Sequence, residues 1–171
     1  IVLPNLHKAL TPGKHTVAVK MADGSSMPYS IAVELNTPKP ASSDECAVRL
    51  AVSLADDRVE EGGVTEAMVK VTNTEADAIP TPTAIIGIPG GLEVRHDQLK
   101  ELVKQGKIAA YEVLGREVVL YWRDMAGEAT VELPLSLVAA IPGSYTAPAS
   151  RAYLYYTDEH KHWVNPLAVQ I

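Results

Sequence analysis

Cys46-Ala-Val-Arg-Leu-Ala-Val-Ser-Leu54 carries a large apolar residue at every second position. A period of two places these side chains on one face of an extended strand, whereas an amphipathic helix repeats every three or four residues. The alternation returns at 67–71 and 131–137, and a nearly continuous apolar run covers 84–88. The pattern therefore predicts strand after strand beyond Cys46.

One segment breaks the alternation and predicts a helix. In Asp97-Gln-Leu-Lys-Glu-Leu-Val-Lys-Gln-Gly106 the apolar residues Leu99, Leu102 and Val103 follow the i, i+3, i+4 spacing of one helix face. Asp97 is the expected N-cap and Gly106 the expected residue after the C-cap. We therefore expect a single short amphipathic helix here.

A hairpin is predicted after the helix, from 108–113 to 117–122, with its turn at Leu114-Gly115. Pro134 lies within the next apolar strand and indicates a local edge or a bulge, because proline cannot donate to a ladder. Further strands are expected at 149–156 and 163–171. About eight closely spaced strands and one helix in 46–171 favour a mainly β fold, an antiparallel β-sandwich.

The first part of the chain is predicted to be separate. Two strands joined by the turn signal Asp23-Gly24 fit residues 14–36, and the proline-containing segment 38–45 is typical of a linker. Two or three strands with one apolar face are marginal alone. We expect residues 1–37 either to pack on the sandwich or to belong to a domain completed by other strands.

Charge and composition exclude several classes. The 15 basic and 21 acidic residues give a net charge of −6, which argues against binding the phosphate backbone of a nucleic acid. The longest apolar run is far below the ~20 residues of a membrane span, and residues 1–10 do not resemble a signal peptide. The single Cys46 allows no internal disulfide.

No convincing active site is found in the sequence. A Gly-x-Ser-x-Gly elbow is absent, and Ile88-Pro-Gly-Gly91 lacks the Gly-Lys-Ser/Thr ending of a phosphate loop. His160 and His162 share one side of an extended segment and form the best metal candidate, but Lys161 between them opposes a cation, and a solvated loop explains the same residues. We expect no metal, no cofactor and no enzymatic activity.

Two surface features remain. Tyr153, Tyr155 and Tyr156 concentrate aromatic residues in one stretch with Trp163. Core filling is the simpler interpretation, yet adjacent Tyr155 and Tyr156 on a strand must face opposite sides, so one is an exposed docking candidate. Lys100 and Lys104 lie at i, i+4 on the helix, where a solvated face is the simpler interpretation.

Read in order, three segments resemble the C-terminal receptor-binding-type domain of the alpha-macroglobulin family, the large thioester-containing proteins that include protease-trapping inhibitors. They are Leu99-Lys-Glu-Leu-Val-Lys-Gln-Gly-Lys-Ile108, Glu112-Val-Leu-Gly-Arg-Glu-Val-Val-Leu-Tyr-Trp122 and Arg151-Ala-Tyr-Leu-Tyr-Tyr-Thr-Asp-Glu159. The segments Leu10-Thr-Pro-Gly-Lys-His-Thr-Val-Ala-Val19 and Met27-Pro-Tyr-Ser-Ile-Ala-Val-Glu-Leu-Asn36 look like the last strands of the split CUB domain of this family.

The resemblance implies a domain plan. Residues 1–37 would be the returning strands of a CUB-like domain, 38–45 a linker, and 46–171 a receptor-binding-type sandwich. The Cys-Gly-Glu-Gln thioester motif and a bait region are absent. The chain would thus be the C-terminal piece of a larger, exported bacterial protein of the periplasm or cell surface.

The resemblance also implies roles for particular residues. Lys100 matches a receptor-recognising lysine of the family, His96 stands where an earlier lysine is expected, and Lys104 completes a possible partner-binding helix. Tyr155 and Tyr156 match aromatic residues that shield the thioester, with Tyr153 as a further candidate. Cys46 stands where relatives can have a cysteine bonded near their C-terminus, and this chain reaches Ile171 without that partner.

The function implied is that of a non-catalytic module. It would dock on the thioester domain and other macroglobulin domains of the same parent chain and shield the thioester until a target protease cleaves the bait. The alternative is a stand-alone β-sandwich module for adhesion or ligand binding. An enzyme with a metal at His160 and His162 is the least favoured interpretation.

Overall fold

The structure, a computed structural model, describes residues 2–11 and 13–171. It divides the chain into two compact units, Ile1–Leu35 and Asn36–Ile171. In the described part of the chain, no helix is long and apolar enough to cross a membrane.

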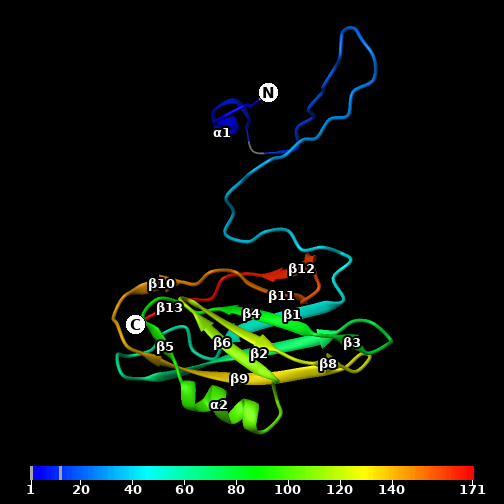
Figure 1. Cartoon of the computed structure of the whole chain (residues 1–171). Helices are drawn as coiled ribbons and strands as arrows, with labels where there is room; N and C mark the ends of the chain where they lie inside the picture. The colour runs from blue at the N-terminus through cyan, green and yellow to red at the C-terminus, as the bar shows by residue number, and fades with distance from the viewer. Residues whose placement is uncertain (1, 12) are drawn as a thin grey trace. The chain divides into compact units, whose positions relative to one another are not determined.

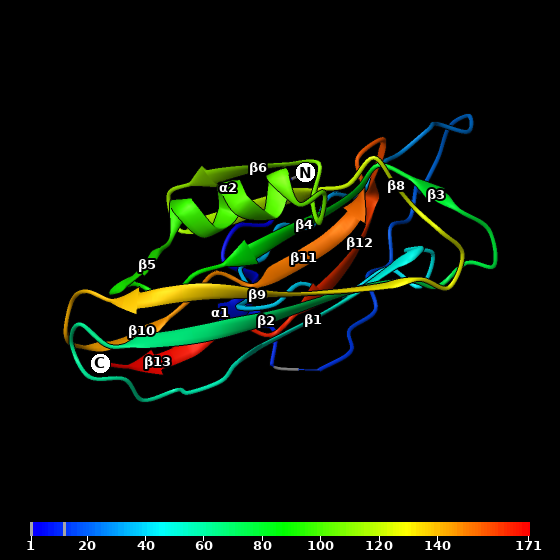
Figure 2. The same ribbon diagram turned by 90° about the horizontal axis from the view of Figure 1, so that it is seen from below.

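The larger unit is a sandwich of two antiparallel sheets (Figures 1 and 2). One sheet has the order β1-β2-β9-β5 and the other β12-β11-β4-β7-β6. Two further pairs, β10-β13 and β3-β8, extend the ends of the sandwich (Figure 2). The strands are β1 (Val48–Leu54), β2 (Val64–Asn73), β3 (Ile79–Pro80), β4 (Pro82–Gly87), β5 (Leu92–Val94), β6 (Ala110–Leu114), β7 (Glu117–Tyr121), β8 (Asp124–Met125), β9 (Thr130–Ala139), β10 (Ser144–Thr146), β11 (Ser150–Leu154), β12 (Thr157–Val164) and β13 (Ala168–Gln170).

The core lies between the two sheets and follows the alternation seen in the sequence. On β2 the buried residues Ala67, Val69 and Val71 face inward, and the residues between them are exposed. Val118 and Leu120 of β7 are fully buried opposite them in the same cluster. Because one face of each sheet is apolar, burial of these two faces drives the sandwich together. The predicted mainly β sandwich with one short helix after Cys46 is confirmed.

The helix α2 (His96–Lys104) begins two residues earlier than predicted. The N-cap is Arg95, and Asp97 lies in the first turn, where its carboxylate accepts a 2.8 Å hydrogen bond from Arg95. The prediction of Asp97 as N-cap is therefore wrong, although its negative charge still suits the helix N-terminus. At the other end Gly106 has φ 69° and donates to Val103, and Lys107 donates to Leu102. This is the Schellman ending expected of Gly106.

Gln98 of α2 completes the sheet where β5 ends. The pairing of β5 with β9 stops at Val94, opposite Leu137. Beyond it, Gln98 Nε2 donates to the Pro134 carbonyl at 3.1 Å, and its Oε1 accepts from the Ser136 N–H at 2.8 Å. The side-chain amide thus replaces a strand residue, and Pro134 sits at the local edge that the sequence predicts.

The smaller unit differs from the sequence prediction. It contains one short helix, α1 (Leu6–Ala9), and residues 13–37 form no strand in the described chain. The alternating apolar side chains are exposed instead, with Val19 at 65% and Ile31 at 57%. The two strands predicted for 14–36 are therefore wrong for this structure, and the physical reason is that two short strands bury too little apolar surface to hold each other.

Candidate functional site

The outer face of the five-stranded sheet, here called the aromatic face, carries most of the unusual side chains. Strand pairing aligns Trp163 of β12, Arg151 of β11, Ile85 of β4, Val119 of β7 and Glu112 of β6 in one row. Ile85 and Val119 are 7% and 3% exposed, yet they lie outside the core cluster between the sheets. Larger side chains on the same outer face must therefore cover them.

Arg151 forms the polar centre of the aromatic face. Its two terminal nitrogens bind the two carboxylate oxygens of Glu117 at 2.6 and 3.3 Å, and both side chains are about one-fifth to one-quarter exposed. The guanidinium also lies 5.2 Å from the ring centre of Trp163. A bidentate pair stacked on an aromatic ring has little freedom to rotate, so this part of the face is rigid.

Three tyrosines, the tyrosine cluster, stand beside this centre. Tyr121 of β7 and Tyr155 have ring centres 6.5 Å apart at 61°, and Tyr155 and Tyr156 have theirs 5.2 Å apart at 84°. Edge-to-face contacts of this kind stabilise ring pairs by about 1 kcal/mol beyond burial. The cluster runs from half-buried Tyr121 to Tyr156, which is 80% exposed.

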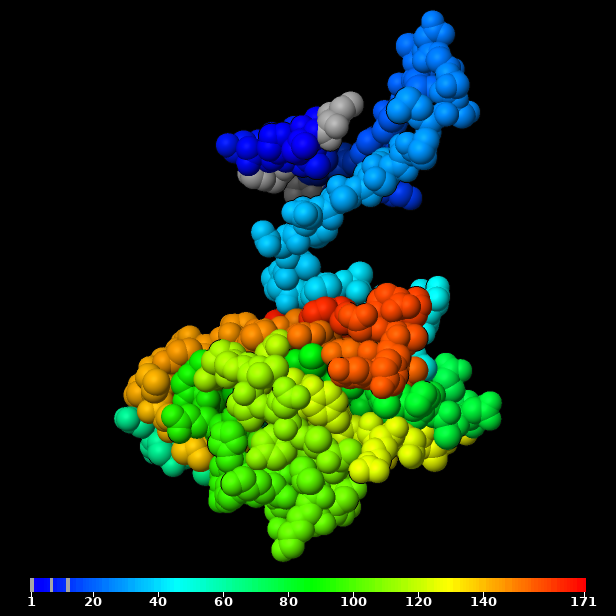
Figure 3. Space-filling view, viewed as in Figure 1, coloured from blue at the N-terminus to red at the C-terminus, as the bar shows by residue number. Residues whose placement is uncertain are grey.

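The predicted strand through Tyr155 and Tyr156 is wrong. Both residues form the turn between β11 and β12, so they are not forced onto opposite faces and both are exposed, Tyr155 at 54%. Pairing ends at Leu154 and resumes at Thr157, directly across the turn. In Figure 3 this turn, in orange, stands at the surface of the larger unit. Tyr153 lies on β11 nearby, with Lys161 Nζ 5.1 Å from its ring centre.

Two phenols of this face, those of Tyr121 and Tyr153, have a raised pKa and stay uncharged in neutral water. Burial, together with a 3.1 Å hydrogen bond to the Glu112 carboxylate and its charge, raises the pKa of Tyr121 to about 12. Burial also raises the pKa of Tyr153. A protonated phenol presents an apolar ring with one polar tip, which suits a protein contact.

Sequence reasoning missed Tyr121, Glu117 and the pairing of Arg151 with Trp163. Each of these residues lies on a predicted strand. Arg151 meets Trp163 across the β11–β12 hairpin, whereas its contact with Glu117 depends on β4 lying between β7 and β11. That order joins segments far apart in the chain, and alternation within a strand carries no information about it.

His160 and His162 lie on strand β12, not on the loop we expected, and they share one side of it as predicted. Each ring binds a protein partner. His160 Nδ1 lies 3.2 Å from Ser43 Oγ, and His162 Nδ1 accepts from the Leu50 N–H at 3.2 Å. In the described part of the chain, no three His, Cys, Asp or Glu side chains gather as metal ligands.

The helix residues His96, Lys100 and Lys104 form one exposed stripe away from the aromatic face, since α2 lies at the β5 and β6 side of the sandwich (Figure 1). His96 has its ring centre 6.5 Å from that of Tyr111 on β6. Lys104 Nζ lies 3.8 Å from Glu101, a contact that stabilises a helix only slightly at such exposure.

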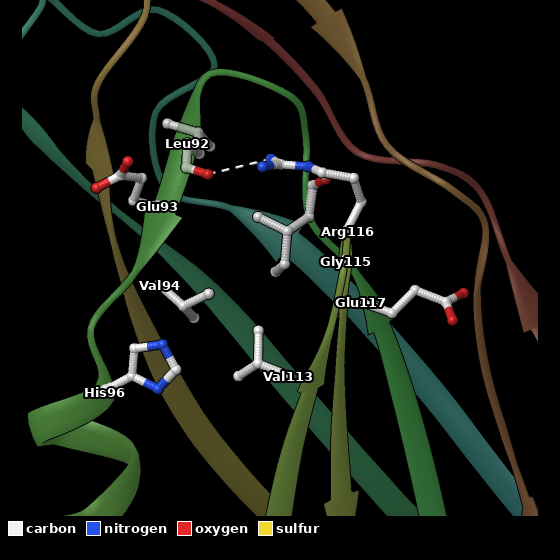
Figure 4. Close-up of a pocket in the computed structure, with 9 residues that line it drawn as sticks. Leu92, Glu93, Val94, His96, Val113, Gly115, Arg116 and Glu117 are labelled. Carbon is white, nitrogen blue, oxygen red and sulfur yellow. Dashed lines mark hydrogen bonds between the residues drawn. The ribbon is translucent and has the colours of Figure 1, made fainter.

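A shallow pocket of about 250 Å³ lies between β5 and the β6–β7 hairpin (Figure 4). Val94 and Val113 line its middle, with His96 at one end and Arg116 at the other. Arg116 donates to the carbonyls of Ile88 and Leu92 at 3.2 and 3.0 Å. Its guanidinium therefore holds the hairpin to β5 and to the loop before it.

Cys46 is a structural residue in this unit. It is 3% exposed, and its Sγ donates to the carbonyls of Val48 at 3.2 Å and Ala152 at 3.6 Å. A buried thiol with two carbonyl partners packs as a small apolar group.

Comparisons with known proteins find a similar fold among solved structures. No family model matches the sequence, and no curated protein matches it. Among solved structures, native alpha-2-macroglobulin from Escherichia coli, spanning domain MG7 to the C-terminus, matches 77% of this chain and 25% of its own, with 15% identity and a TM-score of 0.56. Salmonella alpha-2-macroglobulin reacted with methylamine matches 80% of this chain and 10% of its own, with 16% identity and a TM-score of 0.59.

This chain shares its fold with a part of bacterial alpha-2-macroglobulin. A third structure, the Escherichia coli protein activated by porcine elastase, agrees, with 15% identity, a TM-score of 0.58 and 77% of this chain matched. The chain spans between a tenth and a quarter of the length of these alpha-2-macroglobulin structures. The likeness in fold fits the resemblance read from the helix, hairpin and double-tyrosine segments.

Proposed function

We propose that the chain is a non-catalytic module of a larger, exported alpha-macroglobulin-like protein that traps proteases in the periplasm or at the cell surface. The module docks on other domains of its parent chain through the aromatic face. The observation that carries this proposal is the tyrosine cluster, because Tyr155 and Tyr156 project at a turn while Tyr121 anchors them. Exposed rings held in place bind a partner at low entropic cost.

The finer part of the proposal is that Tyr155 and Tyr156, with Tyr153 beside them, cover a thioester in another domain and exclude water from it. Tyrosine rings suit this role because each brings a large apolar surface to the covered bond. Separation of the two domains after bait cleavage would then expose the thioester.

The first test uses the full-length parent protein, treated with methylamine and weighed intact and after peptide mapping. A parent protein far larger than this chain that gains one methylamine, on a glutamine before this chain in sequence, supports a thioester trap. A large precursor without label removes the shielding role and leaves the module as a docking scaffold. A parent protein no longer than this chain overturns the proposal in favour of a stand-alone binding module.

If the parent protein reacts with methylamine, variants of it then test the tyrosines. In Tyr155→Ala or Tyr156→Ala, spontaneous loss of methylamine-reactive thioester is expected to be about tenfold faster, the equivalent of about 1.4 kcal/mol of lost contact. Tyr156→Phe keeps the ring and serves as the matched control with a near-normal lifetime. Unchanged lifetimes in both alanine variants would remove Tyr155 and Tyr156 as the shield.

For residues 1–37 we propose that strands elsewhere in the parent complete a CUB-like domain. Support comes from the exposed, alternating apolar side chains at Val17, Val19, Ile31, Val33 and Leu35. Such a face is stable only when another sheet or helix covers it.

The helix stripe of His96, Lys100 and Lys104 remains a proposed partner site, supported by its exposure and by the match of Lys100 to the family. Its test is binding of the activated parent to candidate receptors with Lys100→Ala and Lys104→Ala. Equal binding by the wild type and both variants would refute this role.

A further inference from the structure

Residues 42–46, here called the clasp, close the β1–β12 side of the sandwich. Ser42 Oγ accepts from the Trp163 N–H at 2.9 Å and donates to the Trp163 carbonyl at 3.3 Å. The Ser43 N–H donates to the Lys161 carbonyl at 2.9 Å. The clasp therefore occupies the free edge of β12 and satisfies main-chain groups that would otherwise face water or a partner strand.

Two histidines of β12 contact the chain just beyond this edge. His160 meets the clasp itself, with Nδ1 3.2 Å from Ser43 Oγ and Nε2 3.4 Å from a Glu45 oxygen. His162 meets β1, with Nδ1 accepting the Leu50 N–H. That last bond exists only while Nδ1 carries no proton, because a protonated nitrogen cannot accept.

We propose that mild acid separates β1, and with it the clasp, from β12, with protonation of His162 as the trigger. A proton on Nδ1 would place two donors, His162 and the Leu50 N–H, against each other. The device is independent of the proposed function of the aromatic face. Its effect would be to free the chain before β1 from the edge of β12.

The charges around His162 favour its neutral form. Burial first, and then the nearby cations Arg49 and Lys39, lower the pKa of His162 below its usual 6.5. The closed form therefore binds fewer protons than the open form in this range. Its stability is fully present above about pH 6.5 and falls as the pH drops from there toward the lowered pKa.

His160 is the other histidine at this edge. Its Nε2 faces two carboxylates, Glu45 at 3.4 Å and Glu159 at 3.9 Å. Both carboxylates are well exposed, at 79% and 65%. Exposed pairs stabilise by only about 0–1 kcal/mol, so these contacts of His160 contribute little to the closed form. The remaining nearby charges, Lys161 and Asp158, pair with each other.

The test is amide hydrogen exchange of the whole 171-residue chain, followed by NMR at about pH 7.5 and about pH 5.5, with rates corrected for intrinsic pH dependence. The protection of the Ser43, Leu50 and Trp163 amides is expected to fall about tenfold in acid. Val69, in the middle of β2, is the internal reference and stays protected. Equal protection of the clasp amides at both pH values would overturn the proposal.

Variants identify the trigger. His162→Asn places an amide oxygen where Nδ1 lies and removes the titration, so the acid effect should disappear. His160→Asn leaves His162 in place and should keep the effect. If amide protection in His162→Asn falls in acid as much as in the wild type, the mechanism is contradicted. In the wild type, without any variant, the midpoint of the protection change must match the midpoint of the His162 ring titration, and a mismatch would also overturn it.

Discussion

Replacing Gly87 with alanine is expected to destabilise the sandwich by about 3 kcal/mol or more, enough to raise the unfolded fraction over a hundredfold. A Cβ on Gly87 would lie 1.9 Å from the Pro148 carbonyl oxygen. That neighbour is backbone and cannot rotate away. The Gly87 N–H also donates to Ser150 Oγ at 2.9 Å, so the two segments are held at this distance.

Gly87 matters for the aromatic face because Pro148 leads directly into β11. A shift of the chain at Pro148 would move the start of β11, and the tyrosines follow at the end of that strand. Unfolding in guanidinium chloride, followed by tryptophan fluorescence, measures the cost. Gly62→Ala is the matched control, since a Cβ there meets nothing within 4 Å but φ is +80°. Gly62→Ala should lower the free energy of unfolding by about 1–2 kcal/mol from backbone strain alone. If Gly87→Ala lowers it by no more than this, the steric argument is refuted.

Alternation predicted the strands of the sandwich well, because burial of one face imposes a period of two on every strand that lies on the core. The same argument failed in residues 14–36. The pattern there is as regular as in β2, but the apolar side chains of this segment are exposed among the residues that the structure describes. A hydrophobic pattern predicts a strand only if the partner surface is present in the same chain.

The candidate site was predicted in composition but not in geometry. Tyr153, Tyr155 and Tyr156 were chosen because they are concentrated in one stretch. Their turn carries no glycine, asparagine or aspartate, so the usual turn signal is missing. The anchor Tyr121 lies more than thirty positions away, and only the sheet order brings it to Tyr155.

The two open sides of the sandwich are closed by different means. Residues 42–46 cover the edge of β12 with main-chain and serine groups, whereas α2 covers the β5–β6 side. Neither closure is visible from hydrophobic periodicity, because both depend on polar side chains that substitute for a missing strand. Gln98 performs this substitution on the α2 side.

Gln98→Ala is expected to destabilise the larger unit by about 2 kcal/mol, because it leaves the Pro134 carbonyl and the Ser136 N–H without their partner. Ser136 is 7% exposed, so water cannot easily replace the amide. Lys100→Ala, on the exposed side of the same helix, is the control for changes in helix propensity and should cost less than about 0.5 kcal/mol. The measurement is again the free energy of unfolding in guanidinium chloride.

Gln98→Glu separates the two hydrogen bonds. At neutral pH the new carboxylate still accepts from Ser136, but its second oxygen faces the Pro134 carbonyl, so the variant should be destabilised. A protonated carboxyl restores the donor, which raises the pKa of the introduced group in the folded state. Its stabilising contribution is then present in acid and lost as the pH rises through that pKa. Relative to Gln98→Ala, the variant should therefore gain stability near pH 4. A constant difference between the two variants from about pH 7 to about pH 4 would show that the donor to Pro134 contributes nothing.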